Sequence, residues 1–129
     1  MPRYDGERFQ PPAPLAHVVL RSPETGETLP DIPMLLDTGA DVTLVPQTAV
    51  EGLGVLTAGS DQFQVMGFDG TISAASAVRL ELTFARRTFR GDFLVVDQPW
   101  GILGRNVLNA VPLILDGPRL QWDEQPAGA

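Results

Sequence analysis

The chain contains no cysteine, no lysine and a single histidine, and two of these shortages remove whole classes of chemistry. Without cysteine there is no disulfide, no thiolate metal site and no cysteine nucleophile. His17 lies in LAHVVL, without a His, Cys or Glu partner at metal-ligand spacing and without a nucleophile elbow nearby. We therefore expect no metal and no cofactor, and Ser-His-Asp catalysis is disfavoured. The missing lysine, with arginine as the sole basic side chain at nine positions, is interpreted as coding bias.

Long apolar runs and positive charge are also scarce. No stretch approaches the ~18 consecutive apolar residues that cross a bilayer, and no basic-then-apolar leader opens the chain. We therefore expect no membrane partner and a cytoplasmic location. The net charge is −7 and the pI is about 4.4. A surface of that sign repels phosphate backbones, so nucleic acid is not an expected partner.

What is present fits one domain with one hydrophobic core. The chain has 129 residues, of which 43% are hydrophobic and 19% charged. Residues 1–14, MPRYDGERFQPPAP, predict a flexible, proline-rich N-terminal arm. Residues 15–124 are the predicted folded domain, and residues 125–129, QPAGA, a disordered tail.

Strand patterns dominate the predicted domain. VRLELTF alternates apolar and polar residues with period two, as a half-buried strand does, and TFRGDFLVV continues the pattern after a turn. Turn residues separate LAHVVLRS from DIPMLLD, and Asp116-Gly117 separates two further apolar runs, so both regions resemble hairpins. Only GRNVLNA and PQTAVEGLG resemble helices. We predict a mostly β fold, a small closed or partly closed β-barrel with one short C-terminal helix.

Asp37 is an unusual residue in this pattern, because it ends the apolar run MLL and is followed by Thr38 and Gly39. Glycine permits a tight turn, whose backbone N–H groups can hold a partly buried carboxylate ionised, and the Thr38 hydroxyl can lock that turn. Two facing carboxylates that share one proton can act as general base and general acid on a bound water.

Two blocks of sequence resemble a known family. LLDTGADVTLVP resembles the active-site segment of retroviral-type aspartic proteases, the retropepsin-like family. GILGRNVL, residues 101–108, resembles the apolar–apolar–Gly–Arg–Asn segment that precedes the family's C-terminal helix. A glycine-containing hairpin, QVMGFDGTISA, and two alternating strands lie between the blocks in the same order. The resemblance spans about residues 15 to 115 and implies a barrel of the retropepsin (acid protease) type.

The resemblance also implies a role for each matching residue. Asp37 would be the catalytic aspartate, Thr38 would brace the paired loops across subunits, and Gly39 would contact substrate beside the dyad. Arg105 would form an ion pair with Asp41 and would support the site together with Asn106. The residues implied to bind substrate lie in a channel, a flap tip and a pocket wall: Ala40 and Asp41; Met66, Gly67, Phe68, Asp69 and Gly70; and Leu35, Leu44, Pro99, Trp100 and Ile102.

Two of these assignments have purely structural alternatives, since MGFDG also fits an ordinary hairpin and Trp100 also fits the core.

The chain has one Asp-Thr-Gly and no second Asp-Thr-Gly or Asp-Ser-Gly, so it supplies half of a dyad. We therefore expect a homodimer with Asp37 and its symmetry mate facing each other across a twofold axis. RLQWDE, with Trp122 as a buried anchor, is the candidate for a shared terminal sheet.

The predicted function is an aspartic endopeptidase that cuts extended peptide or protein substrates with apolar side chains flanking the cut. The alternative is a catalytically weak or inactive peptide-binding or dimerisation module on the same fold. The chain departs from the viral pattern at three places: Asp69 lies in the predicted flap, Val42 follows Asp-Thr-Gly-Ala-Asp, and the C-terminal hairpin is longer.

Overall fold

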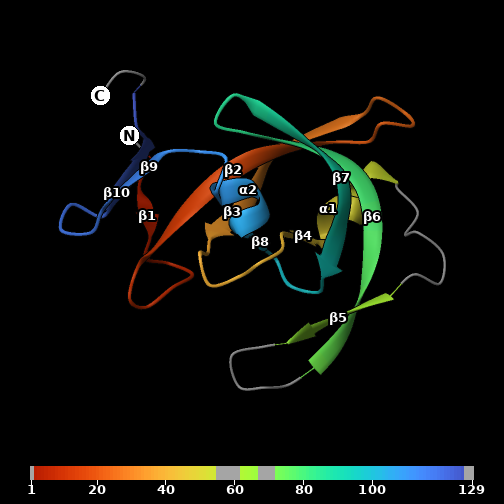
Figure 1. Cartoon of the computed structure of the whole chain (residues 1–129), viewed down its shortest axis with the longest axis horizontal. Helices are drawn as coiled ribbons and strands as arrows, with labels where there is room; N and C mark the ends of the chain where they lie inside the picture. The colour runs from red at the N-terminus through yellow and green to blue at the C-terminus, as the bar shows by residue number, and fades with distance from the viewer. Residues whose placement is uncertain (1, 55–61, 67–71, 127–129) are drawn as a thin grey trace.

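The computed structural model describes residues 2–54, 62–66 and 72–126, with the backbone alone for 62–66 and 72–75 (Figure 1). Strands make up most of this described part, and two short helices complete it. In chain order the elements are β1 (Tyr4–Asp5), β2 (Ala13–Arg21), β3 (Thr28–Leu36), β4 (Leu44–Pro46), α1 (Gln47–Leu53), β5 (Gln62–Met66), β6 (Ile72–Phe84), β7 (Arg87–Val96), β8 (Gly101–Leu103), α2 (Arg105–Leu108), β9 (Leu113–Asp116) and β10 (Gln121–Glu124).

Six of the strands close into a barrel. Their order is β2-β3-β8-β4-β7-β6, and β6 returns to β2 by pairing residues 81–83 with 19–21. The β3–β8 and β4–β7 pairs are parallel, whereas β2–β3 and β6–β7 are antiparallel. Closure gives each of these strands a partner on both sides. The predicted mostly β barrel with a short helix after GILG is confirmed, and PQTAVEGLG supplies the second helix, α1.

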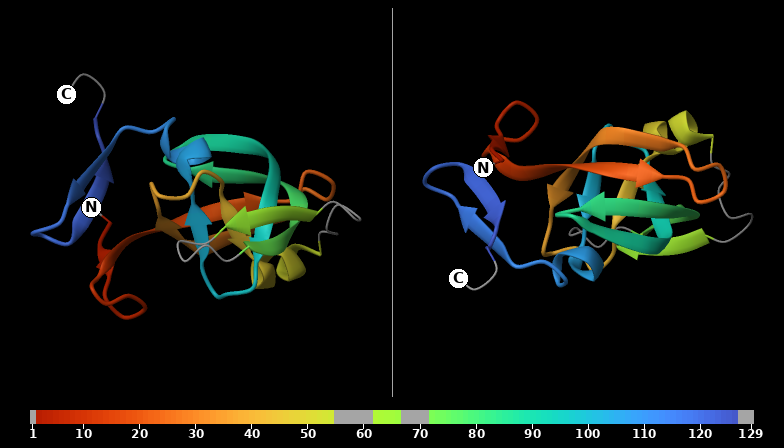
Figure 2. Two further views of the ribbon diagram at one scale, coloured as in Figure 1. Left: turned by 60° about the horizontal axis from the view of Figure 1, so that its bottom comes forward. Right: turned by 90° about the horizontal axis from the view of Figure 1, so that it is seen from above.

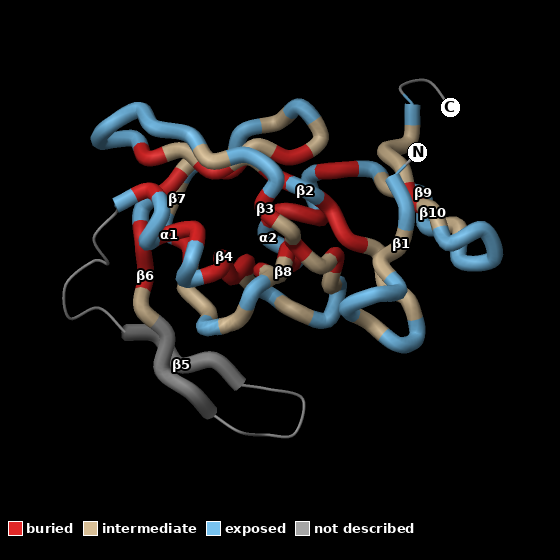
Figure 3. Tube along the Cα trace, turned by 180° about the vertical axis from the view of Figure 1, so that it is seen from behind, coloured by how far each residue is buried: buried red, intermediate tan, exposed pale blue. Residues whose placement is uncertain are grey.

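The barrel interior is the hydrophobic core (Figure 3). On β6, Val78, Leu80 and Leu82 are buried, whereas the alternating Arg79 is exposed, so the predicted period-two strand is confirmed. α1 covers part of the core with Ala49, Val50 and Leu53. The five largest fully buried side chains come from four different strands: Leu20, Met34, Leu80, Leu82 and Leu103.

Both chain termini lie at one end of the molecule, beside the β9–β10 hairpin (Figure 2). The backbone N–H of Tyr4 donates to the Leu120 carbonyl at 2.8 Å, and that of Trp122 donates to the Pro2 carbonyl at 3.0 Å. β1 then pairs with the start of β2. The predicted loosely packed arm is therefore tied down over residues 2–5, because the C-terminal hairpin offers it a strand edge. The domain boundary at residue 14 stays a prediction.

Trp122 is buried inside its own chain rather than left free for a partner. Its side chain is 6% exposed, its Nε1–H donates to the Leu15 carbonyl at 3.1 Å, and its ring lies 5.9 Å from that of Phe84. It anchors the C-terminal hairpin to the barrel. Among the described residues, no helix is long and apolar enough to cross a membrane.

Candidate active site

Asp37 directly follows β3, and backbone groups on both sides hold it in place. Its own N–H donates to the Leu103 carbonyl of β8 at 3.1 Å. The Gly39 N–H donates to its carboxylate Oδ1 at 2.9 Å, and the Ala40 N–H donates to its backbone carbonyl at 3.2 Å. This is the turn that the sequence predicts, with an N–H aimed at the carboxylate. The carboxylate is thus oriented while the residue stays partly exposed.

α2 holds the same turn through Arg105. Its backbone N–H donates to the Ala40 carbonyl at 2.8 Å, and its guanidinium Nη1 donates to the Thr38 carbonyl at 2.8 Å. The implied ion pair with Asp41 is wrong for this chain: of the ion pairs between described residues, none joins Arg105 to Asp41. The guanidinium instead donates to the Thr38 carbonyl, which lies in a turn and has no partner among the described paired strands of the sheet. Asp41 is exposed.

Thr43 is a support residue that the sequence analysis missed. It is 1% exposed; its hydroxyl donates to Asn106 Oδ1 at 2.7 Å and accepts the Gly104 N–H at 3.0 Å. A single buried hydroxyl therefore joins the end of the Asp37 loop to the start of α2. The one available signal was a lone polar residue in VTLVP. Asn106, predicted as structural support, supplies the accepting oxygen.

The two glycines of GILGRN permit a close approach between backbones. A Cβ at Gly104 would overlap the backbone of Val42, and a Cβ at Gly101 would overlap Met34 and the Leu44 carbonyl. Only glycine fits such gaps without displacing the neighbouring chain. The second block of the resemblance is thus packed directly onto the segment that follows Asp37.

Three of the residues implied to form the pocket wall are neighbours in the sheet. Leu35 of β3 is the register partner of Ile102 in β8, which is also the partner of Leu44 in β4. Leu35 and Ile102 are partly exposed and Leu44 is 8% exposed. Met34 and Leu36 alternate with Leu35 and face the core. Leu35 and Ile102 therefore form a partly exposed apolar row next to Asp37, on the face that alternates with the core, and the buried Leu44 continues this row.

Trp100 lies just before β8 and is partly buried, and the neighbouring Pro99 is exposed. Its ring meets that of Phe9 edge-on, with centroids 5.1 Å apart and an interplanar angle of 74°. Phe9 comes from the loop between β1 and β2, in the segment whose sequence predicts a flexible arm. No local sequence signal links these residues, because they lie far apart in the chain.

The flap assignment stays a prediction. β5 pairs antiparallel with residues 72–76 of β6, at the end of β6 that extends away from the barrel, and Met66 lies opposite Ile72 in the backbone register (Figure 1). Gly67, Phe68, Asp69 and Gly70 lie outside the described residues. Within the described part of the chain, no three His, Cys, Asp or Glu side chains gather as a metal site.

The comparisons with known proteins agree with this geometry. The sequence model of the aspartyl protease family matches residues 26–107, which include both the Asp37 loop and the Gly-Arg-Asn block. Among solved structures, the protease of EIAV in complex with the inhibitor HBY-793 matches with a TM-score of 0.56 at 24% identity, over 76% of this chain and 86% of that chain. At that identity the likeness concerns the fold. A search of curated proteins found no match.

Proposed function

Because this chain belongs to the aspartyl protease family, we propose that it is an aspartic endopeptidase acting as a homodimer on extended peptide or protein substrates. The observation that carries the proposal is the Asp37 carboxylate, held by the Gly39 N–H on a turn that the Arg105 guanidinium braces. Such an oriented carboxylate is suited to proton transfer, because its position is set before substrate arrives.

The proposed chemistry needs two copies of the chain. Asp37 of each copy contributes one carboxyl group, and the pair shares one proton because two like charges so close together cannot both ionise. The ionised member takes a proton from a water as that water attacks the scissile carbonyl. The protonated member donates its proton to the carbonyl oxygen. The member that took the proton from water passes it to the leaving nitrogen as the C–N bond breaks, and the proton on the carbonyl oxygen returns to the other carboxylate. One shared proton must be present, so we expect a pH optimum on the acidic side.

Two exposed features support a second copy as the partner. Thr38 is exposed beside Asp37, so its hydroxyl is accessible to a facing loop. The β9–β10 hairpin carries the large exposed apolar side chains found in the described part of the chain, Ile114, Leu115 and Leu120, at 43%, 53% and 40% exposure. β9 pairs with β10 on one side and with no described strand on the other. An apolar strand edge of this kind favours pairing with another chain.

The same proposal assigns the surrounding surface. Gly39, Ala40 and Asp41 would contact the backbone of the substrate. The apolar row of Leu35, Leu44 and Ile102, together with Pro99 and Trp100, would receive apolar side chains flanking the cut. Residues 66–70 would close over the peptide as a flap. Arg105 and Asn106 would act as positioning residues through the Thr38 and Thr43 contacts.

The test is cleavage of a mixed peptide library between about pH 3.5 and 7.5 by the wild type and by Asp37→Asn. We expect cuts with apolar flanking residues from the wild type and none from the variant, with both proteins sharing one circular dichroism spectrum. Cleavage that survives Asp37→Asn refutes the assignment. A folded, dimeric wild type that binds peptides without cutting them would favour the peptide-binding module instead.

A further inference from the structure

The loop between β1 and β2 is a compact structure held by its own hydrogen bonds. β1 closes its base, since Asp5 is the register partner of Ala13. The Asp5 carboxylate accepts the backbone N–H groups of Glu7 and Arg8, both at 2.8 Å, and meets the Arg8 guanidinium at 2.6 Å. The side-chain amide of Gln10 donates to the Gly6 carbonyl at 2.6 Å. Compact loops with joined ends are frequently functional.

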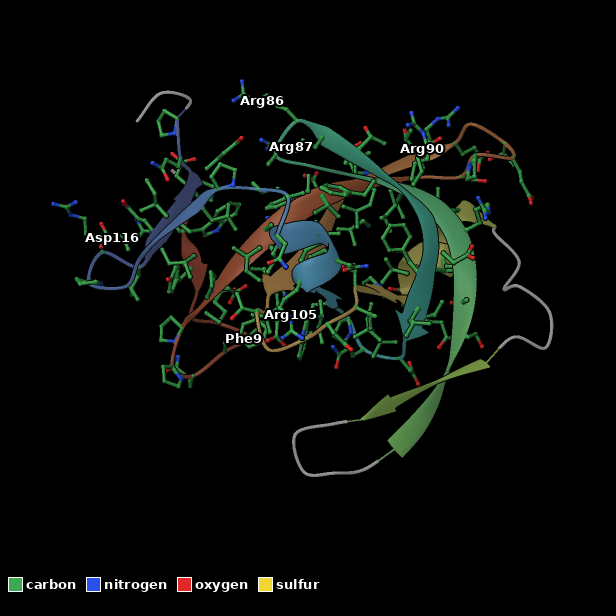
Figure 4. The ribbon with its side chains drawn as sticks, in the orientation of Figure 1. Phe9, Arg86, Arg87, Arg90, Arg105 and Asp116 are labelled. Carbon is green, nitrogen blue, oxygen red and sulfur yellow. The ribbon has the colours of Figure 1, made fainter. Side chains whose placement is uncertain are left out.

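This loop brings one aromatic side chain to the predicted pocket wall. Phe9 lies on this loop, between the Asp5 turn and the Gln10 bond (Figure 4). Its ring meets that of Trp100 edge-on, with centroids 5.1 Å apart. Both residues are partly buried and keep exposed surface. Trp100 is two residues from Ile102, which is the register partner of Leu35, two residues before Asp37. The aromatic pair therefore lies at the start of β8, the strand that carries Ile102 of the apolar row.

We propose, on the basis of the proposed peptidase function, that Phe9 is a specificity-determining residue and forms an aromatic corner with Trp100 that accepts an aromatic substrate side chain. The rings meet at 74°, so a third ring in the corner can stack against one and lie edge-on to the other. A small side chain would leave these ring faces without contact. The preferred ligand is an extended peptide with an aromatic residue at the subsite beside this corner.

The first experiment compares Phe9→Leu and Phe9→Ala with Glu7→Ala as a matched control. Glu7 lies in the same loop, is exposed and contributes only its backbone N–H to Asp5, so its truncation leaves the loop intact. The substrates are peptide pairs that differ by Phe or Ala at one flanking position. We expect the wild type and Glu7→Ala to prefer the Phe peptide in kcat/KM, and Phe9→Ala to lose roughly 3- to 10-fold of that preference.

Phe9→Tyr should retain nearly all of the preference for the Phe peptide, because tyrosine keeps an aromatic ring at position 9. Phe9→Leu should retain part of it, because leucine keeps the apolar contact but not the ring. A purely structural role for Phe9 would lower the melting temperature of Phe9→Ala while the ratio between the two peptides stayed unchanged. That result overturns the proposal and leaves the peptidase function standing.

A second readout does not depend on cleavage. Fluorine labels on the two tryptophans of the chain, Trp100 and Trp122, are followed by NMR in the Asp37→Asn variant. Titration with the Phe peptide should move the Trp100 signal, while the buried Trp122, bonded to the Leu15 carbonyl, serves as an internal reference. The added substitution Phe9→Ala should weaken the binding of the Phe peptide but not of the Ala peptide.

The two readouts separate the two proposals. Peptide binding that moves Trp100 and depends on Phe9, in a protein whose wild type cuts nothing, supports the aromatic corner and refutes the peptidase. Cleavage whose preference for the Phe peptide does not change with Phe9→Ala supports the peptidase and refutes the aromatic corner. If the wild type neither cuts the peptides nor shows a Trp100 shift, both proposals fail.

Discussion

Single side chains decide how firmly the Asp37 turn is held. Arg105 and Thr43 act through different hydrogen bonds: the guanidinium of Arg105 donates to the Thr38 carbonyl, and the buried hydroxyl of Thr43 bonds to Gly104 and Asn106. The sequence shows both motifs, but it does not show the hydrogen-bond partners of Arg105 and Thr43. A hydrogen bond between side chains 63 positions apart has no local pattern.

Replacing Thr43 with valine should destabilise the fold by about 1–3 kcal/mol, because the buried Gly104 N–H loses its acceptor and Asn106 loses its donor. The volume changes little, so the lost hydrogen bonds dominate. Urea unfolding of Thr43→Val against wild type measures the difference. Thr88→Val is the matched control, since the Thr88 hydroxyl meets only the Thr83 hydroxyl at an exposed position and should cost much less. Equal losses for the two variants would contradict this role of Thr43.

Loops and strands set the next level of organisation, and the β1–β2 loop depends on the charge of Asp5. The Arg8 backbone N–H is the main cause that holds the pKa of Asp5 below its ordinary value. Desolvation opposes this shift, while the Arg8 guanidinium and the Glu7 N–H add to it. The ionised form is thus favoured in the folded loop. Its contribution to stability is present above the unfolded value of about 3.9 and is lost as the pH falls through the folded pKa.

Asp5→Asn should therefore destabilise the protein at neutral pH and cost progressively less below about pH 4. In the wild type the ionised Asp5 carboxylate accepts the N–H groups of Glu7 and Arg8. Acid protonates this carboxylate, so the wild type loses the advantage that it has over the uncharged asparagine. Chemical denaturation of both proteins from about pH 7 to pH 2.5 measures the gap. A gap that stays constant across this range would show that the carboxylate charge does not hold the loop.

Among the strands and loops, the sequence pattern predicts β6 correctly but not the N-terminal segment. The alternation in VRLELTF placed Val78, Leu80 and Leu82 in the core, because a strand with one buried face must alternate. The sequence of the N-terminal segment predicts a flexible arm, because prolines and polar residues are typical of exposed chain. Its order comes from the strand edge of β10 and from Trp100, both distant in sequence.

At the scale of the whole molecule, the proposed function requires two chains, and the exposed apolar side chains of β9 are the proposed contact between them. Leu115→Asp should shift the dimer toward monomer, because it places charge on an exposed apolar strand that the proposed interface covers. Sedimentation velocity at several concentrations measures the shift, with Thr88→Asp as an exposed control. A dimer unaffected by Leu115→Asp would remove the β9 hairpin from the interface.

Mixing experiments test the shared dyad directly. After subunit exchange, equal amounts of wild type and Asp37→Asn should show about one quarter of the activity of the same total amount of wild type, because only wild-type pairs carry two aspartates. A value of about one half would mean that each chain acts independently of its partner, and about three quarters that one Asp37 per dimer suffices; either value would refute the paired mechanism.

The amino-acid sequence by itself determined the mostly β class, the strand that ends at Asp37 and the two blocks that resemble the retropepsin-like family. These features depend on local periodicity and on residue types at fixed spacing. Only the tertiary structure decided the partner of Arg105, the role of buried Thr43, the meeting of Phe9 with Trp100 and the burial of Trp122 within its own chain. Each is a contact between distant segments, and the closure of the barrel sets which of those segments become neighbours.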